Sequence, residues 1–407
     1  MRVLIVSQFF WPENFKINDV AKGLKERGQE VSVLTGIPNY PKGKFYNGYS
    51  FFKMKKEDYE GITIYRSSVI PRGSGASINL FLNYFSLALF ASIRILFVKQ
   101  KFDRILVFEA SPITIGIPAI VAKYKFKAPI YFWVQDLWPE SITAAGGVSN
   151  ESIISLVDKL TRFIYRNSKM ILVQSKAFIP YIENQGISSE KIVYLPNSTE
   201  IFYKKVKDNS KFLDLIPKDG PVFMFAGNIG EAQGFDTIIK AAKYLDENDV
   251  KVNWVILGDG RQKKSIINRI ETLSLQDRFF FLGSYPGEDM PHFFVHADAL
   301  LVTLKKNVIF SYTIPSKIQS YLACSKPIIA SLDGEGGRVI LEAECGLVSP
   351  SEDFMSFSRS IITFLKLSSD EREIMGKNAR LYFENEFDRE KQLDNIVNIF
   401  TKNKRLS

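Results

Sequence analysis

Hydrophobic and polar positions follow two periods along the 407-residue chain. Short runs of β-branched and aromatic residues alternate with longer stretches in which apolar residues recur every three or four positions. Strands joined by helices in a parallel sheet give this pattern. In the first half we predict strands at 2–6, 31–35, 62–66, 104–108, 129–133, 170–173 and 192–195, with helices at 18–27, 77–98, 113–124, 152–166 and 176–184.

The alternation is interrupted at residues 197–220, a stretch rich in Asn, Asp, Lys and Pro that we interpret as a linker. A chain of this length is too long for one compact core. The sequence therefore predicts an α/β protein of two doubly wound domains in tandem. Beyond the linker we predict strands at 222–225, 253–257, 279–282, 299–302, 327–330 and 347–349, followed by a helical tail from residue 371.

Composition indicates the redox compartment of the protein and the charge of its partner. The two cysteines exclude a disulfide framework and suit a reducing cytosol, and the first residues are typical of a strand rather than a signal peptide. Residues 1–190 hold 24 Lys and Arg against 15 Asp and Glu, a balance of +9, whereas the remainder holds 29 of each. The basic half favours an anionic partner; a solvated basic surface is the alternative.

The most apolar stretch runs from Ser77 to Val98 and is of marginal length for crossing a membrane. Asn79, Asn83 and Ser86 form a weak polar stripe along it, and basic residues follow directly. A helix lying in the interface of an anionic bilayer is one interpretation. A buried domain helix is the other.

Glycine-rich turns follow several predicted strands of the second half, where open α/β sheets bind nucleotides. Each turn alone is a weak signal, but their repetition in one domain favours a phosphate or sugar site. A further turn at 313–317 is predicted to begin a helix capped by Thr313, with Lys317 in its first turn. The candidate residues are Gly227, Asn228, Gly230, Gly258, Asp259, Gly260, Thr313, Pro315, Ser316, Lys317, Gly334, Glu335, Gly336 and Arg338.

In the first half, Asp136 and Glu140 follow the strand predicted at 129–133. Either carboxylate could accept a proton from an acceptor hydroxyl, although Asp136 could also cap a helix. The polar segment after the first strand, and the residue that follows the strand predicted at 104–108, add candidates for the acceptor side. These are Glu13, Asn14, Lys16 and Glu109.

Several other chemistries lack their signatures. The first strand is not followed by G-x-G-x-x-G, which disfavours a dinucleotide dehydrogenase. No D-x-D pair occurs, and His292 and His296 have no third metal ligand nearby, so we expect neither a metal nor another cofactor. Nucleophile-elbow and Walker motifs are also missing.

The order of these motifs resembles glycosyltransferase family 4, the retaining transferases of GT-B fold, across nearly the whole chain. Within the family the segments look closest to the WbuB-type N-acetyl-L-fucosamine transferases of O-antigen and capsule synthesis. The segments that carry the resemblance are WPENFKIND, LTGIPNYPKGK, QDLWPES, YLPNS, GNIGEAQGFDT, LGDG, TIPSKIQSYLACSKPIIA and DGEGGRVILEAECGL.

Departures from the family pattern affect the donor site most. Asn228 and Gln233 stand where many members have an Arg and a Lys, and a pair of family glutamates corresponds to Tyr312 and Ser320. Gln135 stands near a common histidine, and residues 13–15 replace a Gly-Gly loop. The donor's charge must then be met by other groups, for which Lys317, Lys305 and Arg338 are the candidates.

The resemblance implies two Rossmann-like domains facing each other across a cleft: an acceptor domain at 1–200, a nucleotide-sugar domain at 201–385, and a helix at 386–407 that crosses back to the first. It implies transfer of an N-acetylated sugar from a UDP-sugar to a lipid-diphosphate-linked saccharide, with retained configuration and without a metal. Asp136, Glu140 and Lys317 would be catalytic. The enzyme would be cytoplasmic and peripheral on the inner face of the plasma membrane, held there through 77–98 and the basic domain.

Two other functions are compatible with parts of the sequence. A UDP-sugar 2-epimerase shares the architecture but needs positioned acid–base groups, and the histidines here are confined to 292–296. A nucleic-acid-binding protein would explain the basic half, but no recognition signature is present and the aromatic residues lie in apolar runs. We therefore expect no nucleic-acid partner.

Overall fold

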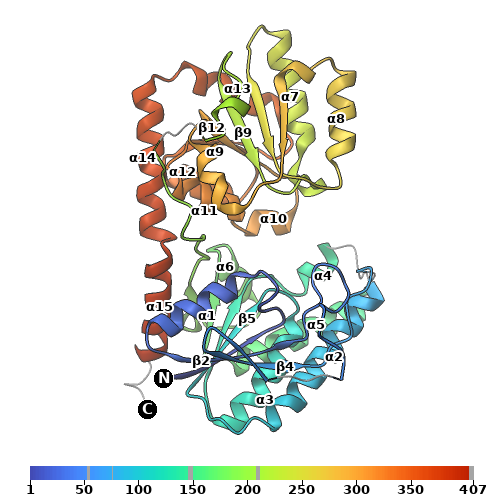
Figure 1. The fold of residues 1–407 in the computed structure, drawn as a ribbon. Helices are drawn as coiled ribbons and strands as arrows, with labels where there is room; N and C mark the ends of the chain where they lie inside the picture. The colour runs from blue at the N-terminus through green and yellow to red at the C-terminus, as the bar shows by residue number, and fades with distance from the viewer. Residues whose placement is uncertain (53–55, 76, 145–149, 208–210, 403–407) are drawn as a thin grey trace. The chain divides into compact units, whose positions relative to one another are not determined.

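The computed structural model describes residues 1–52, 56–75, 77–144, 150–207 and 211–402. The chain forms two compact units, Met1–Leu195 with Leu393–Ser407, and Pro196–Gln392 (Figure 1). The segment predicted as a linker opens the second unit, and its residues 208–210 lie outside the described part. The division by contacts falls at 195/196 and 392/393, beside the predicted boundaries at 200/201 and 385/386.

The first unit is built on an eight-stranded sheet in the order β3-β4-β2-β1-β5-β6-β7-β8. All pairs are parallel except β3 with β4. The strands are β1 (Arg2–Ser7), β2 (Glu30–Gly36), β3 (Lys56–Tyr59), β4 (Ile62–Ser67), β5 (Arg104–Glu109), β6 (Ile130–Val134), β7 (Met170–Val173) and β8 (Ile192–Tyr194).

Helices of the first unit cover its sheet, because the strands alternate apolar side chains between the two faces. On one face α2 packs beside α3, and α3 beside α5 (Figure 1). On the other face α1 and the end of α15 share one core with strand residues such as Val3 and Ile5. The helices are α1 (Lys16–Glu26), α2 (Ser77–Leu96), α3 (Gly116–Phe126), α4 (Glu140–Ala144), α5 (Glu151–Asn167) and α6 (Phe178–Asn184).

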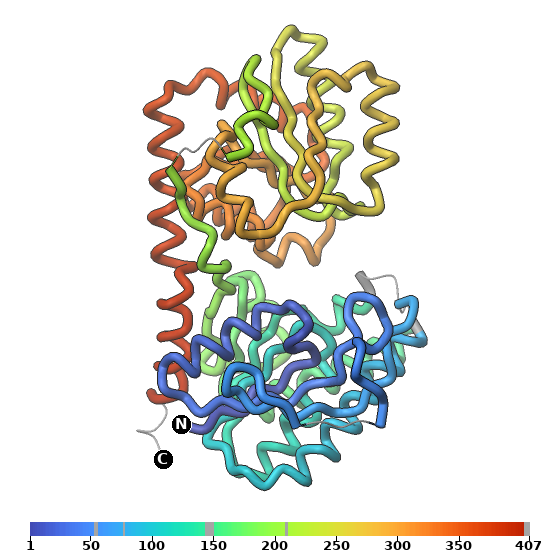
Figure 2. Tube along the Cα trace, in the orientation of Figure 1, coloured from blue at the N-terminus to red at the C-terminus, as the bar shows by residue number. Residues whose placement is uncertain are grey.

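The last helix, α15 (Arg389–Lys402), returns to the first unit from residue 393 onward. Leu393 lies so close to α1 that a Cβ on Gly23 would come within 2.3 Å of its Cδ1. Arg104 Nε and Nη2 donate to the carbonyl of Phe400 at 3.1 and 3.0 Å. These contacts place α15 beside the N-terminal strand and helix (Figure 2).

The second unit contains a six-stranded parallel sheet in the order β11-β10-β9-β12-β13-β14. Alternate residues of β9 point to opposite faces: Met224 lies in a core with α9, α11, α12 and α14, and Phe223 in a core with α7, α8 and α13. The strands are β9 (Val222–Ala226), β10 (Asn253–Leu257), β11 (Phe279–Gly283), β12 (Ala299–Thr303), β13 (Ile328–Ser331) and β14 (Gly346–Ser349). The helices are α7 (Phe235–Glu247), α8 (Lys263–Thr272), α9 (Met290–Phe294), α10 (Val308–Tyr312), α11 (Ser316–Ala323), α12 (Glu335–Glu342), α13 (Phe354–Lys366) and α14 (Ser369–Glu386).

The strands predicted from the pattern are confirmed in both units, whereas β3 was not predicted. β3 reads Lys-Glu-Asp-Tyr and lies at the edge of its sheet. Charged residues are common on edge strands, where they hinder pairing with other chains. Hydrophobic periodicity therefore gave no signal for it.

Helix α2 is amphipathic, but its polar side chains face the domain and its apolar side chains face outward. Its polar residues Asn83 and Ser86 are buried and fasten the chain around Ile70: Asn83 Nδ2 donates to the Ile70 carbonyl at 2.6 Å, and the Ile70 N–H donates to Ser86 Oγ at 2.9 Å. Its outward row is apolar, with Phe81 61% and Phe85 59% exposed. The polar stripe read from the sequence thus faces the domain, and an apolar surface faces outward.

Candidate functional site

The C-terminal edge of the second sheet brings the predicted glycine turns together. The turns after β9 and β10 touch: a Cβ on Gly258, whose φ is +131°, would lie 1.9 Å from the carbonyl oxygen of Gly227. The Ile229 N–H donates to the Asp259 carbonyl at 2.8 Å. Only residues without a side chain permit this approach. The result is an exposed backbone surface at the ends of two neighbouring strands.

Lys317 lies against this surface. Its Nζ donates to Gln233 Oε1 at 2.6 Å and stands 3.8 Å from the centroid of the Phe225 ring, while a Cβ on Gly227 would be 3.6 Å from it. The residue keeps some exposed surface, but protein atoms crowd the ammonium, and this burial lowers the pKa of Lys317 to about 7. The hydrogen-bond acceptor of its ammonium, the side chain of Gln233, is a neutral amide. An anion in contact with Nζ would restore the charged form.

The other two proposed cations are differently placed. Lys305 forms an ion pair with Glu231 at 2.9 Å. Arg338 Nε and Nη2 contact the two oxygens of buried Glu335 at 2.9 and 3.1 Å, and Arg338 also pairs with Glu342 on the same helix. Both cations already have carboxylate partners. Of the three, Lys317 is the best placed to meet a phosphate.

The expected helix cap at Thr313 is wrong by two residues. Helix α11 begins at Ser316 with Pro315 as its N-cap, while Thr313 is the C-cap of the short helix α10. A residue before proline is biased away from the helical region, which keeps Ile314 extended and delays the helix. Lys317 nevertheless stays in the first turn, as predicted.

The remaining predicted donor-side residues lie at the same edge. Asn228 and Asp259 are exposed in the turns after β9 and β10, and the side chain of Asp259 accepts a hydrogen bond from the N–H of Gly260 at 2.7 Å. A Cβ on Gly230 would meet Asn228 Nδ2 at 2.6 Å.

Beyond β13 the chain turns sharply before α12. A Cβ on Gly334, whose φ is +76°, would lie 2.0 Å from the Ser311 carbonyl, and buried Gly336 packs against Pro315. Ser320, which stands for a family glutamate, shares a hydrogen bond of 3.0 Å with Thr199 and is buried. Its role in this structure is therefore packing of the 196–200 segment.

The C-terminal edge of the first sheet holds two neighbouring carboxyl groups. Glu109 ends β5 fully buried; its Oε1 accepts from Trp138 Nε1 at 2.9 Å and its Oε2 from the N–H of Asp136 at 3.3 Å. Burial, with the charge of Asp136 next, raises the pKa of Glu109 well above its usual value. Burial also raises the pKa of half-buried Asp136 to about 6. Of the two, Asp136 is the carboxyl group that ionises near neutral pH.

Glu140 has other neighbours. It opens α4 and lines a hollow of about 480 Å³ with Asp158, Arg162 and Tyr181, whose hydroxyl hydrogen-bonds Glu140. Asp136 lies four residues before α4 and does not cap it. The charge of Asp136 acts on Glu109, which also accepts the Asp136 N–H.

The acceptor-side candidates after β1 serve different purposes. Glu13 is buried and its Oε1 accepts from the N–H groups of Asn39 and Tyr40 at 2.8 and 2.7 Å. Burial raises the pKa of Glu13 to about 6, although those two hydrogen bonds oppose the shift. Asn14 is exposed, and Lys16 begins α1. Glu13 is thus a support for the 39–40 loop.

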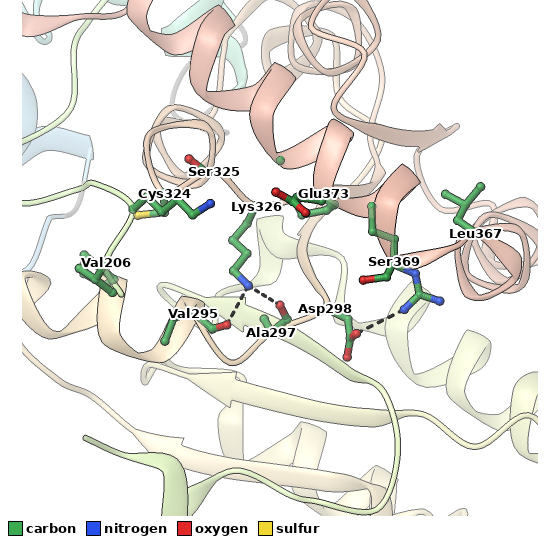
Figure 3. Close-up of a pocket in the computed structure, with 15 residues that line it drawn as sticks. Val206, Val295, Ala297, Asp298, Cys324, Ser325, Lys326, Leu367, Ser369 and Glu373 are labelled. Carbon is green, nitrogen blue, oxygen red and sulfur yellow. Dashed lines mark hydrogen bonds and ion pairs between the residues drawn. The ribbon is translucent and has the colours of Figure 1, made fainter. Parts of the chain in front are cut away.

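A second hollow, of about 460 Å³, lies in the second unit beneath the residues that precede β12 and β13 (Figure 3). Lys326 Nζ donates to the carbonyls of Val295 and Ala297 at 2.8 and 2.7 Å, and Arg372 pairs with Asp298 at 3.3 Å. Because β12 and β13 start here, the hollow is at the opposite edge of the sheet from the glycine turns. Its charged groups hold the domain together.

Within the described ranges, no group of three or more His, Cys, Asp and Glu side chains is placed to hold a metal ion. One helix, Ile78–Leu96, is long and apolar enough to cross a membrane by length and composition. Its inner residues Leu87, Ala91 and Ile95 are buried in the first unit. It therefore belongs to the domain, with an apolar outer face.

Two parallel-sheet Rossmann-like domains and a final helix that rejoins the first define the GT-B class, and the expected fold class is confirmed. The structure is similar to that of HepE from Anabaena in complex with UDP, with a TM-score of 0.70 and 14% identity over 99% of this chain and 100% of the other. The profile "Glycosyl transferases group 1" matches residues 206–382, and "Glycosyl transferase 4-like domain" matches 16–198. The chain belongs to the group 1 glycosyltransferases of family 4, and the expected enzyme class is confirmed.

Curated relatives agree with this class. The chain is 28% identical to the probable glycosyltransferase WbjE of Pseudomonas aeruginosa over 248 residues, 58% of this chain and 60% of WbjE. It is 24% identical over 360 residues, 84% of each chain, to WcaI of Escherichia coli K12, a putative colanic acid biosynthesis glycosyl transferase. The first match spans less than two thirds of its relative.

Sequence reasoning missed one residue at each of the two edges. Phe225 lies under the Lys317 ammonium, and Trp138 fixes Glu109. Phe225 reads as an ordinary strand residue, so its apolar run gave no signal. Trp138 stands within a motif already singled out, and an indole N–H in a polar segment beside a strand end was the available clue.

Proposed function

We propose that the chain transfers a sugar from a UDP-sugar to a lipid-diphosphate-linked saccharide at the cytoplasmic face of a membrane. The single observation that carries the donor side is the Lys317 ammonium held against the glycine turns after β9 and β10. A diphosphate there would accept hydrogen bonds from Lys317 and from the N–H groups at the start of α11, which no side chain caps. The leaving UDP would be stabilised by the same groups.

The family and the UDP complex of HepE support a UDP-linked donor. We further propose an N-acetylated sugar, with UDP-N-acetyl-L-fucosamine as a first candidate, and retention of the anomeric configuration. Both rest on the sequence resemblance. No divalent metal is required in this proposal, because the positive charge of Lys317 and the helix starts at α7 and α11 face the same strand ends.

The acceptor is assigned to the first unit, where Asp136 would bind or deprotonate the attacking hydroxyl. A lipid-linked acceptor is supported by the outward row of α2 and by the +9 balance of residues 1–190. Apolar side chains at the interface and basic residues near anionic headgroups would hold the enzyme on the bilayer. O-antigen, capsule or a related polysaccharide is the proposed product class, in keeping with WcaI.

The direct test offers the purified enzyme a panel of UDP-sugars with a polyprenyl-diphosphate-linked sugar, read by mass spectrometry. We expect one UDP-sugar to extend the acceptor by one residue, in EDTA as well as in Mg²⁺. Each UDP-sugar is also incubated without acceptor, because an epimerase would turn over alone. Failure of every sugar nucleotide to extend any lipid-linked acceptor would refute the proposal.

Membrane attachment is tested on the α2 surface. The double variant Phe81→Ser with Phe85→Ser should lower binding to phosphatidylglycerol vesicles by about tenfold or more, because each phenyl ring buried in lipid contributes about 1.5–3 kcal/mol. The matched control is Ile374→Ser with Leu381→Ser, two exposed apolar residues of α14. Equal vesicle binding by both double variants would contradict the assigned surface.

A further inference from the structure

Arg72 presents an uncompensated charge on the first unit. Its guanidinium stands over two aromatic rings, 5.7 Å from the centroid of Phe9 and 5.4 Å from that of Tyr40. Among the described residues it meets no carboxylate, and its side-chain N–H groups donate no hydrogen bond. Cation–π contact orients a guanidinium without neutralising it, so all of its donors remain available to an anion.

The backbone around Arg72 is fixed by a set of hydrogen bonds. The Arg72 N–H donates to Asn39 Oδ1 at 3.2 Å, and the N–H of Gly73 donates to the Gly43 carbonyl at 3.0 Å. The loop that carries Tyr40 is itself held by the buried carboxylate of Glu13. Such support lowers the entropy lost when a ligand binds.

The aromatic rings form a compact platform. Phe9 and Phe15 are stacked with centroids 4.5 Å apart, and Tyr40 lies 5.3 and 5.4 Å from them. Tyr40 is 39% exposed, so part of the platform is open to solvent. A flat cation beside a partly open aromatic surface suits a phosphate joined to an apolar or sugar group.

The sheet topology places Arg72 and its aromatic rings between the expected positions of the acceptor's lipid chain and its sugar. Phe9, Tyr40 and Arg72 follow β1, β2 and β4, which are neighbours in the sheet, so they share its C-terminal edge with Glu109 and Asp136. The same edge is where α2 begins, with its apolar outward row. A lipid chain along α2 would bring its phosphates to the position of Arg72.

We propose that Arg72, held on the rings of Phe9 and Tyr40, binds the diphosphate of the lipid-linked acceptor. This inference rests on the proposed function and adds to it the group that recognises the acceptor's phosphates. Arg72 acts in binding, with bidentate hydrogen bonds from the guanidinium to phosphate oxygens. Lys317 serves the donor diphosphate on the second unit.

The test measures binding of farnesyl diphosphate by calorimetry, with saturating UDP present to occupy the donor site. Farnesol, inorganic diphosphate and phosphatidylglycerol vesicles are titrated in parallel. Arg72→Gln should weaken farnesyl diphosphate binding about 10- to 100-fold, the usual cost of losing hydrogen bonds to a charged group. It should leave farnesol unchanged, and Arg72→Lys should give an intermediate loss because one ammonium replaces a planar fork.

The control variant is Lys101→Gln, which removes one exposed positive charge beyond the far end of α2. It should change the affinity for farnesyl diphosphate by less than about twofold, since general attraction alone is weak at physiological salt. The proposal is overturned if Arg72→Gln binds farnesyl diphosphate as the wild type does. It is equally overturned if farnesol or vesicle binding falls by the same factor, which would make Arg72 a general lipid contact.

The two proposals can fail separately. Binding of farnesyl diphosphate reports on Arg72 whether or not any sugar is transferred. Absence of transfer by the wild type, with the Arg72 dependence intact, would remove the proposed function alone. Transfer by the wild type, with unchanged acceptor affinity in Arg72→Gln, would remove only the further inference.

Discussion

The C-terminal edges of the two sheets share a topology but carry opposite chemistry. In the second unit, closely packed glycine turns lie beside one crowded ammonium, that of Lys317. In the first, buried Glu109 and half-buried Asp136 bring two carboxyl groups together. The edge of the second unit favours an anion, whereas the carboxyl groups of the first unit favour a proton. A glycosyl transfer needs both, one for the leaving diphosphate and one for the attacking hydroxyl.

The largest expected effect comes from removing the cation. Lys317→Ala should lower kcat about 100- to 1000-fold, as does loss of one preorganised donor to a developing negative charge. Sugar transfer at saturating acceptor measures it, with the fold checked by circular dichroism. Lys264→Ala, an exposed lysine on α8, is the control and should retain wild-type rates. Comparable rates in the two variants would remove the proposed role of Lys317.

The role of Asp136 at the C-terminal edge of the first sheet is tested by the pH dependence of the rate. Because burial raises the pKa of Asp136 to about 6, the fraction ionised falls as pH drops through 6, and the rate should fall with it. Asp136→Asn should lower kcat about 100-fold, remove this acidic limb and leave UDP affinity unchanged. The exposed Glu183→Gln is the control. An acidic limb that persists in Asp136→Asn would assign the titration to another group.

A smaller effect is expected at the glycine turns. Gly258→Ala places a Cβ 1.9 Å from the Gly227 carbonyl, so the turn must move. UDP affinity should fall roughly tenfold, or about 1.4 kcal/mol. Gly283→Ala is matched, because Gly283 also has positive φ, +82°, but no atom lies within 4 Å of its added Cβ. If the two alanines weaken UDP binding equally, backbone strain and not the close approach is responsible.

Most of the fold could be predicted from the sequence. Buried parallel strands appear in it as nearly continuous apolar runs, and the helices between them show apolar residues with a period of 3.6. Strand β3 escaped since its charged residues carry no such pattern. The sequence also did not show which side of α2 packs against the domain. Asn83 and Ser86 look like a solvent stripe, and only the tertiary contacts with Ile70 show that they point inward.

The sequence predicted where the site residues lie along the sheet edges, but not which side chains contact one another there. Glycine turns and strand-end carboxylates mark the edges, yet Lys305 and Arg338 read like Lys317 until their ion pairs are known. The same limit applied to Asp136, whose charge acts on Glu109, and to Glu140, which hydrogen-bonds Tyr181. Sequence spacing reports contacts along a helix; pairs across strands depend on register.

Calorimetric titration of UDP at pH 8, in two buffers of different ionisation enthalpy, tests the central claim most directly. Since the pKa of Lys317 is about 7, most molecules carry a neutral amine at that pH, and a bound diphosphate should draw about one proton onto it. We predict UDP binding with proton uptake, and weaker binding without uptake in Lys317→Ala. No measurable affinity of the wild type for UDP, or uptake that persists in the variant, would contradict the account.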